Sequence, residues 1–199
     1  LATASNSAAA SMALPVAEAA QIIADLADAL NTAGQAGLVH RDVKPENVLL
    51  DETTGRAMLA DFGIARGMAG EVDGARTAQR VAVGTPTYMS PEQAAGDTVD
   101  ARSDLYALGV VGYELLAGRP PFRADTAAAV ASKHLAEQAT PIEAIRTDVS
   151  HAVAHAIGRA LEKDPSKRWQ TGAEFRHAVL GESPIPWSGR ASRRRPALG

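Results

Sequence analysis

The octapeptide His-Arg-Asp-Val-Lys-Pro-Glu-Asn at residues 40–47 and the tripeptide Asp-Phe-Gly at residues 61–63 constrain this chain more than any other feature. Two short apolar runs lie between them, separated by a turn rich in Asp, Thr and Gly. Such a pattern predicts a β-hairpin, which returns the chain to the place where it started. The hairpin would bring Asn47, just before the first strand, beside Asp61, just after the second.

The residue types gathered at the mouth of this hairpin fit the transfer of a phosphoryl group. An amide oxygen from Asn47 and a carboxylate from Asp61 are suitable ligands for a hard cation such as Mg²⁺. Asp42 and Lys44 lie on the loop leading in, so a base and a cation reach the same point. A transferring phosphoryl group needs positioning and charge neutralisation more than covalent help. The alternative is a polar loop of ordinary turn residues. Such a loop does not account for so many residues suited to phosphoryl transfer at this spacing.

These motifs resemble the catalytic loop and the metal-binding loop of bacterial (Hanks-type) serine/threonine protein kinases, and residues 15–180 resemble the C-terminal lobe of the catalytic domain. The resemblance implies an α+β fold, mostly helical, in which a kinase-like large lobe carries a small catalytic β-hairpin. It implies that Asp42 accepts or orients the proton of a substrate hydroxyl and that Lys44 approaches the γ-phosphate. A Lys two residues after the catalytic Asp is typical of Ser/Thr kinases rather than Tyr kinases.

The resemblance also implies the cofactors ATP and Mg²⁺ or Mn²⁺. Asn47 and Asp61 would hold the metal ions that bridge the phosphates. The nucleotide-contacting positions would be Lys44, Glu46, Asn47, Leu49 and Asp61. Leu49 matches the residue that packs beneath the adenine ring, although an apolar strand residue fits a plain core position equally well.

Several residues around the catalytic loop are expected to support it without taking part in the chemistry. His40 would pack near Phe62. Arg41 would pair with a phosphate on the activation loop, because a guanidinium fork suits phosphate oxygens. Asp104 matches the family residue that accepts hydrogen bonds from the backbone of the His-Arg-Asp loop. Its alternative role is a negative charge favoured by the dipole at the start of a buried helix.

Residues 61–92 form a long Gly-rich, charged stretch without periodicity, and so long a loop in a compact domain is usually functional. The resemblance makes it the activation segment. Thr77 is then the candidate phosphorylation site, although an ordinary exposed Thr explains it equally well. Thr85 matches the Thr that bonds to the catalytic Asp and Lys, which makes it catalytic support. Glu92 closes the segment and is predicted to form a structural ion pair with Arg168.

Hydrophobic periodicity predicts the helices. Apolar residues at helical spacing predict an amphipathic helix of about 18 residues that starts with Pro15. A run that is apolar on nearly all faces predicts a buried helix from Leu105 to Ala117, ended by Gly118. Three more patterns predict helices over residues 126–137, 149–161 and 171–180, the last opened by a capping box of Thr171 and Glu174. Four His at helical positions, expected to be surface or packing residues, are His134, His151, His155 and His177.

Composition narrows the class of protein. With 199 residues the chain can bury a sizeable core, and because aromatic residues are only 4% that core must be built from aliphatic side chains and Ala. A net charge of −3 argues against a nucleic-acid-binding protein. The absence of Cys excludes disulfides and thiolate metal sites, and it fits a reducing compartment such as the cytoplasm. No apolar run is long enough to span a membrane.

The two ends of the chain differ from its middle. Residues 1–14 are rich in Ala and Ser and correspond, by resemblance, to the segment after the interlobe hinge. Residues 181–199 contain prolines and the basic run Arg193–Arg195, so we expect a disordered tail. In receptor-type kinases a basic linker often leads to a membrane span, which would lie in segments absent here; a solvated tail is the alternative.

A complete kinase also needs a Gly-rich loop over the phosphates, a strand Lys and a helix Glu. None is recognisable in residues 1–199, so the sequence predicts a kinase fragment without its N-terminal lobe and with little activity of its own. The complete enzyme would be a non-specific serine/threonine protein kinase acting on proteins and self-associating for trans-autophosphorylation. The alternatives are a lone lobe or pseudokinase that serves as a scaffold, and a small-molecule phosphotransferase. The intact catalytic residues argue against the scaffold, and the activation segment argues for a protein substrate.

Overall fold

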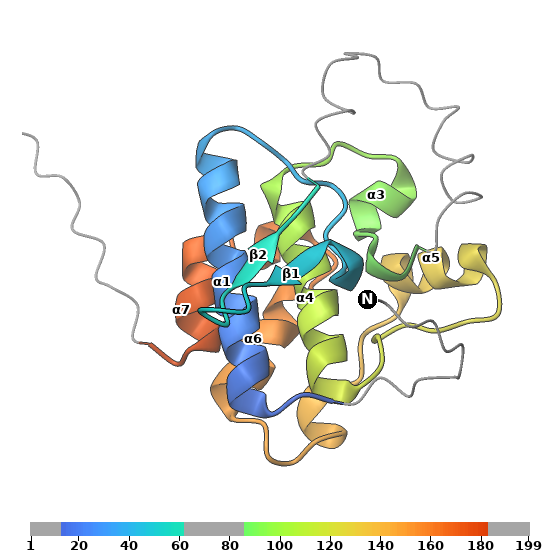
Figure 1. Ribbon diagram of the computed structural model, residues 1–199. Coiled ribbons are helices and arrows are strands. Elements are labelled where there is room, and N and C mark those ends of the chain that lie inside the picture. The colour runs from blue at the N-terminus through green and yellow to red at the C-terminus, as the bar shows by residue number, and fades with distance from the viewer. Residues whose placement is uncertain (1–12, 62–85, 183–199) are drawn as a thin grey trace, which may run out of the picture.

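The computed structural model of the protein describes residues 13–61 and 86–182 and consists mainly of helices around one small hairpin (Figure 1). The α+β, mostly helical class predicted from the sequence is confirmed. The helices are α1 (Val16–Gln35), α3 (Pro91–Ala95), α4 (Ala101–Ala117), α5 (Ala127–Ala136), α6 (His151–Ala160) and α7 (Gly172–Val179). The strands are β1 (Val48–Leu50) and β2 (Ala57–Leu59), and short 3₁₀ turns cover Pro45–Asn47, Pro86–Tyr88, Ile142–Ala144 and Pro165–Lys167.

The predicted hairpin forms as an antiparallel pair in which Val48 lies opposite Leu59. Its turn is closed by Asp51, whose carboxylate accepts hydrogen bonds from the backbone N–H of Thr53 and of Thr54, both at 2.8 Å. The hairpin rests on α1, where the Asp25 carboxylate accepts from the N–H of Ala57 at 3.0 Å. The hairpin is therefore fixed to the core from one side, in front of α1 and α4 in Figure 1.

Helix α4 is the central helix, buried on nearly all sides as its sequence predicts. It begins earlier than the predicted Leu105, because the Asp100 side chain caps it by accepting from the N–H of Arg102 at 2.8 Å. It ends at Gly118, which has a φ of 70° and so occupies the left-handed region that favours Gly. Close helix packing, expected from the scarcity of aromatic residues, is evident at Gly112, where a Cβ would lie 2.7 Å from Ile157 Cδ1.

The other predicted helices are present with shifted ends. Pro15 precedes α1 as its N-cap, with ψ 139°, instead of forming its first turn, so the expectation for Pro15 is wrong by one position. The Thr171 hydroxyl caps α7 as predicted, but the Glu174 carboxylate accepts from the N–H of Gln170 and only half of the capping box forms. Helix α3 is not predicted from the sequence, because residues 61–92 lack periodicity and it begins at their end.

Helices α1 and α7 lie side by side along one flank (Figure 1). Their close approach depends on Gly172, because a Cβ at this position would collide with the backbone oxygen of Ala27. The Asn31 side chain completes the junction by accepting from the N–H of Ala173 at 3.2 Å. Within the described ranges, no helix combines the length and the apolar content needed to cross a membrane. The expected disorder of residues 181–199 concerns a segment that lies mostly outside the described residues.

Two Gly→Ala substitutions should have opposite effects on stability. Gly172→Ala should lower the free energy of unfolding by about 1–3 kcal/mol, because backbone atoms of α1 must move to admit the methyl group. Gly158→Ala, in the interior of α6, should raise it by about 0.5–1 kcal/mol, because among the described residues no heavy atom lies within 4 Å of the new Cβ. Urea unfolding monitored by circular dichroism measures both. A stability gain in Gly172→Ala would contradict the packing described for α1 and α7.

Candidate active site

The catalytic loop is held by a buried carboxylate in the first turn of α4. Asp104 accepts hydrogen bonds from the backbone N–H of His40 at 2.7 Å and of Arg41 at 2.8 Å. The bonds predicted from the sequence for Asp104 are thus present. Burial raises the pKa of the Asp104 carboxyl, and the two N–H groups oppose this shift by favouring the charged form.

These bonds hold a strained backbone. Arg41 has a φ of 66°, in the left-handed region that costs a residue with a Cβ about 1–2 kcal/mol. Its carbonyl accepts a hydrogen bond from the Gln93 side chain of α3 at 3.0 Å. Gln93 also completes a capping box with Ser90 at the start of α3. Gln93 is not among the site residues predicted from the sequence. Ser90 followed three residues later by Gln93 is nevertheless a recognisable capping-box signal.

His40 links the two ends of the hairpin and is fully buried. Its Nδ1 accepts from the N–H of Asp42 at 3.3 Å, and its Nε2 lies 3.0 Å from the carbonyl oxygen of Ala60. Because a carbonyl oxygen can only accept, Nε2 carries the hydrogen. The ring therefore ties the catalytic loop to the end of β2, which agrees with a packing role. Phe62, the expected neighbour of His40, lies outside the described residues.

Two side chains of the loop, those of Lys44 and Asn47, contact the Asp42 carboxylate. The Lys44 ammonium lies 2.8 Å from Asp42 Oδ2. The Asn47 amide donates to the backbone oxygen of Asp42 at 2.8 Å and to Oδ2 at 3.2 Å. The carboxylate is thus oriented by a cation and an amide, and it stays partly exposed to solvent. Such an oriented carboxylate can position a hydroxyl group or accept its proton.

Asn47 and Asp61 lie close together at the hairpin mouth, as the sequence predicted. The N–H of Ala60, the residue before Asp61, donates to the Asn47 backbone oxygen at 2.8 Å. Because the Asn47 amide nitrogen is turned toward Asp42, its Oδ1 is the atom that could ligate a metal ion. Asp61 has a φ of 55°, which turns the chain sharply at the end of β2. An amide oxygen and a carboxylate are the donor types that Mg²⁺ prefers.

The Asn47–Asp61 pair supplies only two protein ligands. Over residues 13–61 and 86–182 the structure contains no group of three or more His, Asp or Glu side chains arranged for a metal ion. A cation held by Asn47 and Asp61 would therefore complete its coordination with phosphate oxygens and water, as Mg²⁺ commonly does.

The surface beside this site is apolar. Leu49 is 52% exposed on β1, so the alternative that it is a plain core residue is wrong. Its cross-strand partner Met58 is 45% exposed, and Leu38 and Leu50 are exposed to a similar degree. Glu46 is also exposed, in the middle of the 3₁₀ turn that leads into β1. Contact of Leu49 with an adenine ring remains a prediction.

The turn Pro86–Tyr88 lies next to the catalytic loop and is anchored to α4. The Tyr88 hydroxyl donates to the Glu114 carboxylate at 2.6 Å. Burial and this carboxylate raise the pKa of Tyr88, so the hydroxyl keeps its proton. Neither residue was singled out from the sequence, although Glu114 is a charged residue in an otherwise apolar run. Thr77 and Thr85 lie outside the described residues.

The predicted ion pair forms and fixes Glu92 in α3. The guanidinium of Arg168 binds both carboxylate oxygens of Glu92, at 2.7 and 2.8 Å, and is fully buried. The Ser103 hydroxyl donates to the same carboxylate. Burial alone would raise the pKa of Glu92, but the hydrogen bonds from Arg168 and Ser103 and the charge of Arg168 outweigh it and lower the pKa.

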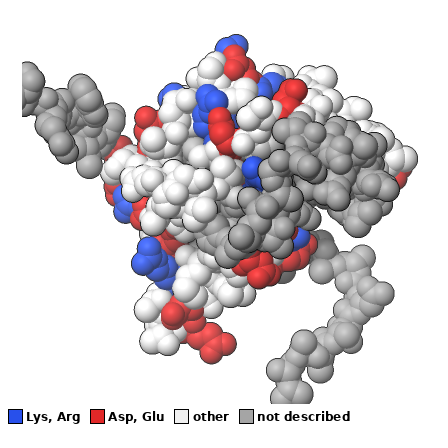
Figure 2. All heavy atoms as spheres, turned by 90° about the horizontal axis from the view of Figure 1, so that it is seen from above, with Lys and Arg blue, Asp and Glu red and all other residues white. Residues whose placement is uncertain are grey.

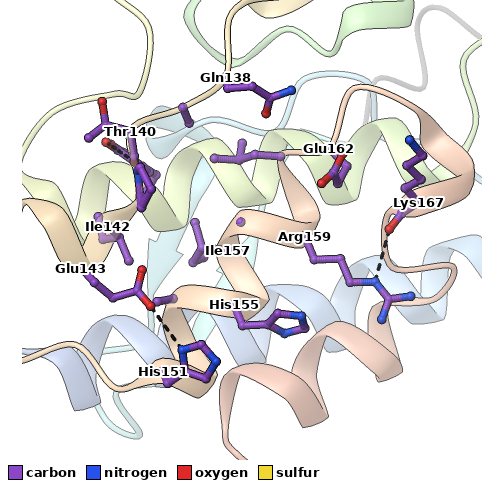
Figure 3. Close-up of a pocket in the computed structure, with 16 residues that line it drawn as sticks. Gln138, Thr140, Ile142, Glu143, His151, His155, Ile157, Arg159, Glu162 and Lys167 are labelled. Carbon is purple, nitrogen blue, oxygen red and sulfur yellow. Dashed lines mark hydrogen bonds and ion pairs between the residues drawn. The ribbon is translucent and has the colours of Figure 1, made fainter.

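A hollow of about 610 Å³ lies apart from this site, between α6 and the segment before it. Figure 3 shows Glu143 and His151 at one end of the hollow and Arg159 and Lys167 at the other. Acidic and basic side chains are interspersed over the described face in Figure 2.

Comparison with known proteins agrees with this geometry. The model of the protein kinase domain family matches residues 3–180. The chain belongs to the protein kinase family. The kinase chain is 44% identical over 162 residues to the serine/threonine-protein kinase PknB of Mycolicibacterium smegmatis, covering 81% of this chain and 26% of the relative. It is equally similar to PknB of Mycobacterium tuberculosis, over 170 residues, 83% of this chain and 27% of the relative.

Solved structures support the same family. The crystal structure of the Mycobacterium tuberculosis PknI kinase domain superposes with a TM-score of 0.65 and 34% identity, covering 86% of this chain and 58% of that one. The chain thus spans about a quarter of the length of these curated relatives and little more than half of the solved kinase domain.

Asp104→Asn should destabilise the catalytic loop. An amide can offer only one oxygen to two N–H donors, so the free energy of unfolding should fall by about 2 kcal/mol. Hydrogen exchange at the amides of His40 and Arg41 should accelerate in the same variant. Asp97→Asn, at an exposed position, is the matched control and should leave both measurements unchanged. Unchanged exchange at His40 and Arg41 in Asp104→Asn would refute the anchoring.

Glu92→Gln should be strongly destabilising at pH 7, by about 3–5 kcal/mol, because it leaves Arg168 buried without a counter-charge. The pKa of Glu92 is lowered in the folded state, so its stabilising effect is present above about pH 4.5 and is lost as the pH falls through the folded pKa. The difference from wild type in urea midpoint should therefore shrink in acid. Glu137→Gln, which breaks a surface pair with Lys133, should cost only about 0.2–0.5 kcal/mol. Equal costs for the two substitutions would contradict a special role for the buried pair.

Proposed function

We propose that this chain carries the phosphoryl-transfer machinery of a serine/threonine protein kinase that moves the γ-phosphate of ATP to Ser or Thr hydroxyls of proteins. The observation that carries the proposal is the Asp42 carboxylate, oriented by Lys44 and Asn47 beside Asp61. A base, a mobile cation and two oxygen ligands for Mg²⁺ or Mn²⁺ are the groups that this reaction requires.

Each side chain has a distinct task in the proposed reaction. Asp42 orients the attacking hydroxyl and takes its proton as the bond to phosphorus forms. Lys44 neutralises negative charge on the transferring group, for which a flexible ammonium is suited. Asn47 Oδ1 and the Asp61 carboxylate hold the metal ion. ATP supplies the phosphoryl group and leaves as ADP when the bond between the β- and γ-phosphates breaks, and Leu49 and Glu46 are assigned contacts with the nucleotide.

Further assignments concern regulation, catalytic support, location and partners. Thr77 is the phosphorylation site that would order the activation segment by pairing with Arg41, whose guanidinium is exposed. Thr85 supports Asp42 and Lys44. The reaction belongs in the cytoplasm, with self-association for trans-autophosphorylation. The names of the PknB relatives, serine/threonine-protein kinases, support a protein substrate.

Residues 1–199 alone should transfer phosphate poorly. A Gly-rich phosphate loop and a strand Lys have no counterpart in this sequence, and half of the nucleotide site would have to come from other residues. The side chains of Leu38, Leu49, Leu50 and Met58 are exposed apolar groups. Such a surface favours contact with further protein residues, and a scaffold could bind a partner through the same surface. The scaffold remains the second candidate, and it makes no use of Asp42.

The decisive test is phosphate transfer from ATP to a Ser/Thr peptide by the full-length gene product. Asp42→Asn should lower kcat by about 10²–10⁴-fold, because the oriented carboxylate is lost. Asp51→Asn is the matched control: it lies on the same hairpin, an Asn can close the same turn, and activity should not change. Wild-type activity that survives Asp42→Asn would refute the assignment of the base. A full-length protein that binds a substrate but transfers no phosphate would favour the scaffold.

A further inference from the structure

His134 on α5 is a buried polar residue that the proposed chemistry does not use. Its side chain is fully buried, and its ring packs edge-on against Tyr106 and Phe122, with centroids 5.7 and 4.8 Å away. From the sequence it was expected to be a surface or packing residue. A packing role alone would not require the two hydrogen-bonding nitrogens of an imidazole, which are costly to bury without partners.

Both nitrogens of His134 have partners far apart in the sequence. Nε2 lies 3.0 Å from the carbonyl oxygen of Thr87, and Nδ1 lies 2.9 Å from the Tyr106 hydroxyl. Lys163 continues the series, because its ammonium donates to the Tyr106 hydroxyl at 3.3 Å. Four groups from α4, α5, the turn Pro86–Tyr88 and the segment after α6 thus form one chain of hydrogen bonds.

The direction of each bond in this chain is determined. The Thr87 carbonyl can only accept, so His134 Nε2 carries the hydrogen. Lys163 can only donate, so the Tyr106 oxygen accepts from it and directs its own hydrogen to His134 Nδ1. Every donor then has one acceptor, and only the neutral Nε2–H form of His134 satisfies all three bonds.

The surroundings favour that neutral form. Burial and the positive charge of Lys163 lower the pKa of His134 to about 4, with the Thr87 carbonyl opposing the shift. The pKa of Lys163 itself is lowered to about 8, by burial and by the charge of Arg168, so the ammonium persists at neutral pH. Its charge lies 4.3 Å from the centre of the Phe122 ring, a favourable position for a cation.

Thr87 lies in the middle of the turn that borders the catalytic loop. Both attachments described so far follow Thr87 in the chain: Tyr88 is bonded to Glu114, and α3 is fixed by the Glu92–Arg168 pair and reaches the Arg41 carbonyl through Gln93. The bond from His134 is therefore a further attachment of residues 86–95, which contact the catalytic loop at the Arg41 carbonyl through Gln93. Since Arg41 immediately precedes Asp42, a protein substrate that presents its hydroxyl to Asp42 would come close to this segment.

We propose that His134 is a positioning residue for the protein substrate: its neutral Nε2–H imidazole, oriented by Tyr106 and Lys163, holds the Thr87 carbonyl and so fixes the turn on which the peptide binds. This inference rests on the proposed kinase function and specifies how the substrate surface is kept in place. Loss of the bond should weaken peptide binding while leaving ATP binding and the chemical step unchanged.

Two amide substitutions of different length separate positioning from packing. A Gln at position 134 can place its amide nitrogen near the position of Nε2 and donate to Thr87, whereas an Asn is one methylene too short. In the full-length kinase, His134→Asn should raise KM for a peptide substrate by roughly 3- to 10-fold, the loss expected for one neutral hydrogen bond. KM for ATP and kcat should not change, and His134→Gln should behave like wild type. His155→Gln, on the exposed side of α6, is the control for a His→Gln change.

Two NMR measurements on residues 1–199 test the contact without any activity. Long-range ¹H–¹⁵N correlation at pH 7 should show His134 as the Nε2–H tautomer. Hydrogen exchange at the amide of Met89, which donates to the Pro86 oxygen at 3.2 Å, should accelerate in His134→Asn but not in His134→Gln. Tyr106→Phe keeps the ring and removes the orienting hydroxyl, so it should accelerate the same exchange if the His134 variants do not fold.

The outcomes are distinct. An Nδ1–H or charged His134, or unchanged Met89 exchange in His134→Asn and Tyr106→Phe, would overturn the proposal. An equal loss in kcat and in both KM values would also overturn it, because it would indicate a general structural defect. A full-length wild-type protein that transfers no phosphate would refute the proposed function, and the tautomer and Met89 exchange would then decide on the His134–Thr87 contact alone.

Discussion

The candidate site depends on one buried carboxylate. Asp104 holds the backbone of His40 and Arg41 in a conformation that Arg41 would not adopt by itself, since its φ is 66°. The orientation of Asp42 follows from that conformation, and Lys44 and Asn47 both bond to Asp42. Burying the Asp104 carboxylate is energetically costly, but its two hydrogen bonds fix the geometry of the loop. A reacting hydroxyl would have to be aligned at this loop to within a fraction of an ångström.

Much of this site could be predicted from the sequence because its members are close together in the chain. Asn47 and Asp61 are separated only by the hairpin, and local strand and turn signals bring them together. The Glu92–Arg168 pair, 76 residues apart, was accessible only through the resemblance to kinases. No local signal joins His134 to Tyr106 or Thr87, which are 28 and 47 residues away, because periodicity shows which face of a helix is buried but not which residue it meets.

In the fold, too, the features with a clear local sequence pattern could be predicted and the others could not. Helix α4 was recognised by its all-round apolar character, whereas α3 was missed because five residues are too few to show a period. The scarcity of aromatic residues predicted an interior of small side chains, and Gly109, Gly112 and Gly172 are the positions at which helices touch. Such contacts leave little room for substitution, so the core depends on the shapes of its residues as much as on their hydrophobicity.

The first turn of α4 carries two attachments on consecutive residues. Asp104 holds the backbone of His40 and Arg41, and Ser103 holds the Glu92 carboxylate of α3. Consecutive Cα atoms are about 3.8 Å apart whatever the rest of the molecule does. The covalent backbone therefore keeps the two anchoring Cα atoms at a constant distance, so motion of the surrounding helices moves the two anchors together.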